Sequence, residues 1–292
     1  MKLIAALFLQ VCALAQQPTV LVITADSADY VLAAGGTLAA MAAKGSAIHV
    51  IRVSNEEKEA WDLSPEEAAL RTKTESEAAA RLLGVKEVIS LGYRAGELAD
   101  IPFTTLRDKL IFYIRHYKPG VLFLPNPYIE YERVFDRYHT GRAAEDAWNA
   151  AALENHLPPF TASGLKPHLV PEVYYFGQPV DPRRRDAEST ETFVPQLKQM
   201  DIAGTLATKE KAAQALKTTN DAVTRRLKAR LDATNRRLPA LQTINDASIN
   251  ALVHENVQGL ARIAAQGTAY KAAEEFRYAG LAYRIPAKYR RP

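Results

Sequence analysis

Charged side chains follow two of the apolar runs in this sequence, and their types could support either metal binding or ion pairing. Carboxylates together with an imidazole can hold a divalent metal ion such as zinc, manganese or iron. Carboxylates beside a guanidinium form ion pairs instead. The side chains in question are Asp26 and Asp29 after the run 19–24, and Asp136, Arg137 and His139 after the run 120–124.

The elements that position these side chains alternate along the chain. Strands separated by helices of ten or more residues indicate parallel βαβ units with right-handed crossovers. The fold class is therefore predicted to be α/β: a Rossmann-like, mostly parallel sheet flanked by helices, with a C-terminal helical extension. Periodicity and end signals predict strands at 19–24, 47–53, 85–91, 120–124 and 170–176, a turn at Gly35-Gly36, and helices at 37–44, 64–84, 104–117 and 141–153.

Three of the predicted loops leave the carboxyl ends of strands. They are residues 25–34, 54–63 and 125–140. In open α/β sheets, ligands bind in the crevice outside these strand ends. We therefore expect the three loops to meet at one site.

The pattern changes after about residue 200. Segments 205–238 and 244–266 are rich in Ala and Leu, charged at helical spacing, and separated at Pro239. They predict two or three helices packed on the sheet. We expect one α/β domain over residues 16–292, with the C-terminal helices at about 200–292.

The first fifteen residues have the pattern of a cleaved signal peptide. Lys2 precedes an apolar run that is too short to span a bilayer and ends in the small residues Ala13 and Ala15. We therefore predict a secreted or periplasmic protein, with no membrane span after cleavage. The single cysteine, Cys12, lies inside this segment. The mature chain is thus expected to lack disulfides, cysteine-ligated zinc and thiol nucleophiles.

Charge does not predict a nucleic-acid partner. The formal net charge is +4 and the pI about 9.0. The longest basic stretch, 225–237, is interleaved with Ala, Leu and Asp at helical spacing, which is typical of a solvated helix face. The expected partner is a small-molecule or glycan ligand, and the oligomeric state is not predicted.

Several segments, in order and in spacing, resemble the LmbE-like (PIG-L) de-N-acetylase family. Residues 26–37 match in length and frame the family's His-Pro-Asp-Asp-Glu motif and the Gly-Gly-Thr that follows it. Further similar segments are 53–55, 75–85, 91–98, 131–147, 201–209 and 273–276. The resemblance implies the family's fold and its reaction, the hydrolysis of an N-acetyl group on an amino-sugar conjugate.

In that family, the first motif supplies a His and an Asp to a zinc ion, and its other Asp is the general base for the zinc-bound water. Carried over by position, the resemblance places the ligand His on Asp26 and the ligand Asp on Asp29. It places the general base on Ala28, which cannot accept a proton.

The second motif supplies another ligand His. An alignment without gaps places its Asp on Asp136 and its His on Arg137, whereas a shift of two residues gives the ligand role to His139. The resemblance therefore implies zinc or another divalent metal as cofactor only if His139 takes that role.

Three interpretations stay open at this point. In the first, Asp26, Asp29 and His139 bind a divalent metal, Asp136 is the base, and hydrolysis survives in altered form. In the second, Arg137 pairs with the two aspartates in place of the metal, and the protein is an inactive glycan-, ligand- or partner-binding relative. In the third, Asp136 only begins a helix and His139 lies on the surface.

Other polar residues in these segments are candidate binding residues. Arg71 and Glu75 either form an ordinary pair one helical turn apart or line the pocket. Tyr138 could stack on a sugar ring. The candidate binding residues are Asn55, Arg71, Glu97, Asn126, Arg137 and Tyr138.

Overall fold

The computed structural model describes residues 17–127, 134–177 and 196–282. The predicted signal peptide, residues 1–15, lies outside these ranges. The helices are α1 (Ser27–Ala43), α2 (Pro65–Leu82), α3 (Phe103–Tyr117), α4 (Phe135–Ala151), α5 (Pro158–Ala162), α6 (Leu206–Gln214), α7 (Lys217–Ala233) and α8 (Asp246–Ala264), and a short 3₁₀ turn, η1, spans Leu98–Asp100. Within the described ranges, no helix is long and apolar enough to cross a membrane.

In the described part of the chain, the strands form one seven-stranded sheet in the order β3-β2-β1-β4-β5-β7-β6. The first five strands in that order are parallel, and β7 runs antiparallel to both of its neighbours. The predicted α/β class with a mostly parallel sheet is confirmed. The strands are β1 (Val20–Thr24), β2 (Ile48–Ser54), β3 (Glu87–Tyr93), β4 (Val121–Leu124), β5 (Glu172–Phe176), β6 (Gln196–Asp201) and β7 (Ala273–Tyr278).

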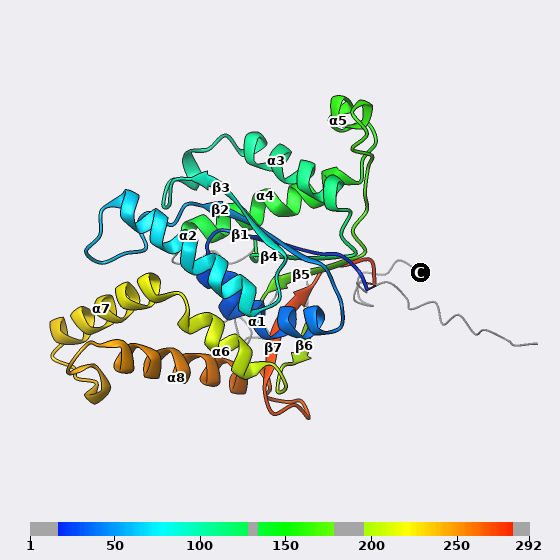
Figure 1. Ribbon diagram of the computed structural model, residues 1–292. Helices are drawn as coiled ribbons and strands as arrows, with labels where there is room; N and C mark the ends of the chain where they lie inside the picture. The colour runs from blue at the N-terminus through cyan, green and yellow to red at the C-terminus, as the bar shows by residue number, and fades with distance from the viewer. Residues whose placement is uncertain (1–16, 128–133, 178–195, 283–292) are drawn as a thin grey trace, which may run out of the picture.

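Helices cover both faces of this sheet (Figure 1). Strand β1 is buried throughout because its side chains alternate between two cores. Val20 and Val22 pack in the core between the sheet and helices α1, α2, α6 and α8. Leu21 and Ile23 pack in the core between the other face of the sheet and helices α3 and α4. The continuous apolar run that predicted this strand follows from burial on both faces.

The predicted turn at Gly35-Gly36 is wrong. Helix α1 begins at Ser27 and passes through both glycines. A Cβ added to Gly36 would lie 2.8 Å from side-chain atoms of Ile202, so this glycine permits close packing and makes no turn. The predicted start of the fourth helix, residue 141, is also wrong, since α4 begins at Phe135.

The C-terminal helices are fastened to α1 through a buried ion pair. Glu274 of β7 accepts hydrogen bonds from the backbone N–H groups of Gly36 and Thr37, at 2.9 and 2.8 Å. The Nζ atom of Lys209 in α6 lies 2.8 Å from the same carboxylate, and both side chains are 2% exposed. The carboxylate is thereby both neutralised and hydrogen-bonded, as a buried charge requires.

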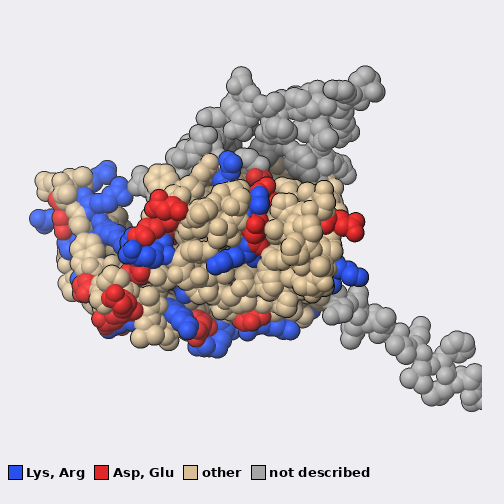
Figure 2. Space-filling model, turned by 90° about the horizontal axis from the view of Figure 1, so that it is seen from above, with Lys and Arg blue, Asp and Glu red and all other residues tan. Residues whose placement is uncertain are grey.

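Residues 225–233 of the basic stretch lie on α7, and residues 234–237 follow it. Arg225 pairs with Asp221 and Lys228 with Asp232, each one helical turn apart and at 2.8 Å. Lys and Arg side chains are interspersed with Asp and Glu on the face shown in Figure 2. This arrangement agrees with the solvated helix face predicted for the stretch.

Replacing Gly36 by Ala should destabilise the fold by about 1–3 kcal/mol, because the added methyl group collides with Ile202. Gly259 in α8 is the matched control, since a Cβ there meets no atom within 4 Å. Gly259→Ala should be neutral or stabilising by up to about 1 kcal/mol. Urea unfolding measures both, and equal stability of the two variants would contradict the packing role.

Candidate functional site

The candidate site lies where the strand order reverses. From β1 the sheet continues through β2 to β3 on one side and through β4 to β5 on the other. Such a reversal leaves a crevice at the carboxyl ends of the two central strands. Asp26 follows β1, and α4, which carries Arg137, follows β4. The structure therefore brings the first and third predicted loops together.

The central contact is an ion pair between Asp26, at the start of α1, and Arg137, in α4. Arg137 donates from Nε to Asp26 Oδ2 at 2.8 Å and from Nη2 to Asp26 Oδ1 at 2.9 Å. Its Nε also lies 3.7 Å from Asp29 Oδ1. The side chains are 24% exposed for Arg137, 10% for Asp26 and 11% for Asp29. This two-bond geometry is the strong form of the arginine–carboxylate interaction.

Asp26 also begins helix α1. Its Oδ1 accepts the backbone N–H of Asp29 at 2.8 Å, which is the N-cap interaction. The positive end of the helix dipole favours a negative charge there. The hydroxyl of Thr24 donates to the carbonyl of Asp26 at 2.8 Å and so fixes the strand-to-helix turn. One carboxylate thus holds both α1 and Arg137.

The side chains present do not fit a bound metal ion. Both oxygens of Asp26 already accept from a guanidinium. The ring of His139 packs edge-on against Tyr138, with centroids 5.5 Å apart, and no hydrogen bond joins His139 to Asp26 or Asp29 in the described chain. Over residues 17–127, 134–177 and 196–282, no group of three or more His, Cys, Asp or Glu side chains could hold a metal. Of the three alternatives, the geometry favours the ion pair.

Asp136 anchors a neighbouring loop. Its buried carboxylate accepts the backbone N–H of Gly96 at 2.6 Å and that of Leu98 at 3.3 Å. These bonds tie the first turn of α4 to the segment between β3 and η1. The predicted role of Asp136 as a general base stays a prediction.

Two other candidate binding residues connect loops to each other. Asn55 Oδ1 accepts the backbone N–H groups of Glu57 and Ala95, at 3.2 and 3.3 Å. Glu97 pairs with Lys58 at 2.9 Å and with Arg94 at 3.3 Å. Asn55 and Glu97 thus join the loop after β2 to the loop after β3, and their contact with a ligand stays a prediction.

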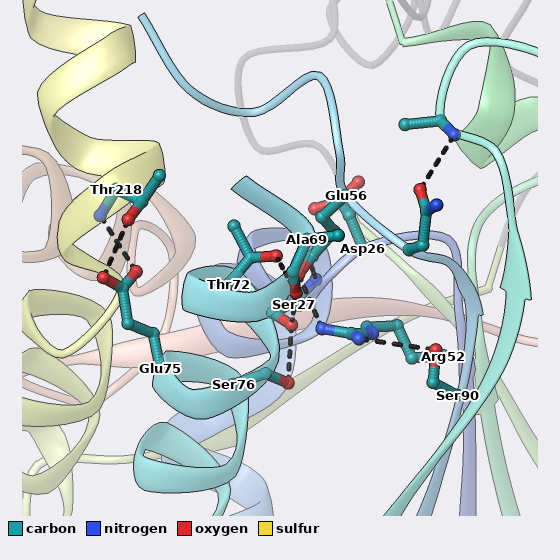
Figure 3. Close-up of polar contacts among 12 residues, drawn as sticks. Asp26, Ser27, Arg52, Glu56, Ala69, Thr72, Glu75, Ser76, Ser90 and Thr218 are labelled. Carbon is teal, nitrogen blue, oxygen red and sulfur yellow. Dashed lines mark hydrogen bonds and ion pairs between the residues drawn. The ribbon is translucent and has the colours of Figure 1, made fainter. Parts of the chain in front are cut away.

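The remaining candidates occupy different surroundings. Asn126 is buried directly after β4, and Tyr138 is half-buried in α4. Arg71 forms an exposed pair with Glu67 at 2.6 Å, so the alternative in which it pairs with Glu75 does not hold. Glu75 instead accepts the backbone N–H and the hydroxyl of Thr218, at 2.9 and 2.8 Å, at the start of α7 (Figure 3).

Glu56 is a buried acid beside Asp26 that was not among the predicted site residues. Glu56 has a φ of 57°, in the left-handed region, and its side chain points inward. It accepts from the backbone N–H of Ser27, and Arg52 Nη1 donates to it at 2.7 Å. The hydroxyl of Ser27 lies 3.2 Å from the same carboxylate and 2.7 Å from Ser76 Oγ (Figure 3). Arg52, a charge within a buried strand, was the available signal that an acid lies nearby.

The pKa of Glu56 is raised to about 7, mainly by burial. The charge of Asp26 also raises this pKa, and the charge of Arg52 opposes the rise. An unfolded glutamate titrates near 4.5, so folding takes up a proton and wild-type stability falls as pH rises through 7. From about pH 5 to pH 8, the wild type should lose about 1–3 kcal/mol relative to Glu56→Gln. Urea unfolding at both pH values measures this, and parallel pH profiles would contradict it.

A double-mutant cycle tests the central ion pair. Arg137→Met should lower the free energy of unfolding by about 2 kcal/mol, because it leaves a mostly buried carboxylate without a cation. Adding Asp26→Asn should restore part of this loss, since Asn still accepts the Asp29 N–H and carries no charge. Thermal or urea unfolding of the four proteins gives the coupling energy, and strictly additive losses would show that the pair contributes nothing.

Comparisons with known proteins agree with this fold. Residues 21–148 match the family described as PIG-L, GlcNAc-PI de-N-acetylase. A diacetylchitobiose deacetylase of Thermococcus kodakarensis is 30% identical over 156 residues, which are 52% of this chain and 57% of the relative. The match thus spans less than two thirds of that relative's length.

Solved structures share the architecture over most of the chain. N,N'-diacetylchitobiose deacetylase from Pyrococcus horikoshii has a TM-score of 0.69 at 22% identity, over 90% of this chain and 84% of that one. GalB, a 4-carboxy-2-hydroxymuconate hydratase from Pseudomonas putida, has a TM-score of 0.61 at 18% identity, over 92% and 98%. These likenesses show the fold, and the hydratase shows that the fold carries more than one chemistry. The resemblance found in the sequence is confirmed, since residues 21–148 match the PIG-L family model.

Proposed function

We propose that this protein binds an N-acetyl amino-sugar conjugate at the carboxyl ends of β1 and β4, and that it does so without a metal ion and without hydrolysis. The observation that carries the proposal is the guanidinium of Arg137 on both oxygens of Asp26. The ligand class comes from the two relatives that are diacetylchitobiose deacetylases.

The chemistry of the pair supports binding over turnover. Metal-assisted amide hydrolysis needs a cation with an open coordination position that lowers the pKa of a bound water. A guanidinium neutralises the aspartates but offers no such position. The base position of the family falls on Ala28, which has no group to take a proton. Guanidinium and carboxylate groups, such as those at this crevice, are donors and acceptors of the kinds that acetamide and hydroxyl groups of a ligand require.

A metal-dependent de-N-acetylase is the competing function. It is favoured by the 30% identity to a deacetylase and by Asp29, which stands at a ligand position of the family motif. It requires Arg137 to leave Asp26 and the ring of His139 to turn toward both aspartates. Metal binding would then depend on Asp29, which gives a direct test.

Metal removal separates the two functions. We expect the purified protein to contain far less than one zinc or manganese ion per chain, and calorimetry to show diacetylchitobiose binding that EDTA leaves unchanged. Cellobiose, which lacks the acetamido groups, is the control ligand and should bind more weakly. Acetate release should stay at background. A stoichiometric metal ion that is lost in Asp29→Ala, together with metal-dependent acetate release, would establish the deacetylase instead.

A further inference from the structure

The loop between β2 and α2 turns a second acid toward the site. The backbone N–H of Glu59 donates to the carbonyl of Glu56 at 3.0 Å and closes a tight turn. Two further acids of this loop, Glu57 and Glu59, have different surroundings. Glu57 is fully engaged, because Asn55 Nδ2 donates to it at 2.9 Å and Arg94 Nε at 2.8 Å.

Glu59 has no such donors. Its closest cation is Arg226 of α7, whose Nη1 lies 3.8 Å from Glu59 Oε2, too far for a hydrogen bond. In the part of the chain that the structure describes, no group donates a hydrogen bond to the Glu59 carboxylate. The side chain is nevertheless only 29% exposed. A carboxylate held away from most of the solvent gains when a ligand supplies donors.

The charges around Glu59 are those of the site itself. Burial raises the pKa of the Glu59 carboxyl, and the negative charges of Asp26 and Asp136 raise it further. Arg226 and Arg137 act in the opposite direction. Glu59 therefore lies within the electrostatic field of the Asp26–Arg137 pair, whereas the charges that act on Glu57 are those of Arg94 and Lys58.

Arg226 links this acid to the C-terminal extension. Its Nη2 donates to the carbonyl of Lys58 at 3.1 Å, so the guanidinium holds the backbone beside Glu59. Helix α7 lies outside residues 21–148, the part that matches the family. The backbone beside Glu59 is thus held by a side chain from outside the segment that matches the family.

We infer that Glu59 is a ligand-binding residue, which accepts hydrogen bonds from hydroxyl or amide N–H groups of the sugar conjugate, and that Arg226 is its positioning residue. Sugar hydroxyls and an acetamide N–H are donors, and a carboxylate accepts from two of them at once. The inference rests on the proposed function, since it names a residue by which that site recognises its ligand.

The test compares two acids of the same loop. Diacetylchitobiose binding is measured by calorimetry with EDTA present, for the wild type and for Glu59→Ala, Glu59→Gln and Glu57→Gln. Loss of charge-assisted hydrogen bonds should weaken binding about tenfold or more in Glu59→Ala. Glu59→Gln keeps one acceptor and should lose less. Glu57→Gln should stay within about twofold of the wild type, and Arg226→Ala should weaken binding less than Glu59→Ala.

The possible outcomes distinguish a failure of the proposed function from a failure of the role of Glu59. A wild type that binds none of the sugar overturns the proposed function, and the role of Glu59 with it. A wild type that binds while Glu59→Ala binds equally well overturns the role of Glu59 alone. Equal losses in Glu59→Ala and Glu57→Gln, with a lowered melting temperature in both, would show that the loop acts only as a structural unit.

Discussion

A carboxylate at the start of α1 that is almost shielded from water must have a cation beside it. The side chain of Asp26 is 10% exposed and caps the helix as well as carrying a charge, so the charge needs a cation close by. Arg137 supplies the cation from the first turn of α4. Because α1 follows β1 and α4 follows β4, this single pair joins the two halves of the sheet at the point where the strand order reverses. The geometry of the whole crevice depends on it.

The same logic holds for the second buried acid at this helix end. Where the family motif has proline, this chain has Ser27, and a proline could not donate the N–H that Glu56 accepts. Glu56 in turn has its own arginine, Arg52. Helix α1 therefore begins between two acids, each of which accepts hydrogen bonds from a separate guanidinium. Substitutions at the motif that look like decay one by one form a consistent set of compensated charges.

The sequence predicted the elements whose signals come from burial. It did not predict the elements that depend on contacts with residues distant in the chain. The five parallel strands were predicted because burial on both faces leaves apolar runs, and α2 because its cap and first turn are local signals. Strands β6 and β7 were missed, since an antiparallel edge and a buried Glu274 that binds Lys209 interrupt the apolar pattern. The start of α1 was missed because Gly36 was interpreted as part of a turn. Gly36 instead permits close packing against Ile202, which is distant in the chain.

The candidate site divides in the same way. Asp26, Asp29 and Arg137 were identified by position in the motif, and their pairing was one of the open alternatives. Glu56 and Glu59 were not identified, because three acids in five loop residues are typical of a solvated surface. Only the fold shows that Glu56 turns inward and that Arg226 reaches across from α7 to the backbone beside Glu59.

The C-terminal extension completes the site as well as the core. Lys209 and Glu274 fasten it to the middle of α1, far along the helix from the cap at Asp26. Arg226 then extends from the same extension toward the loop after β2. A helix held at its start by Arg137 and at its middle by Glu274 cannot shift without moving both the crevice and the extension. Since the same fold also carries a hydratase, the chemistry available here is decided by the few side chains that this rigid frame presents. In this chain, the side chains at the crevice are Arg137, which is paired with Asp26, and the neighbouring Glu59, which we infer binds the ligand.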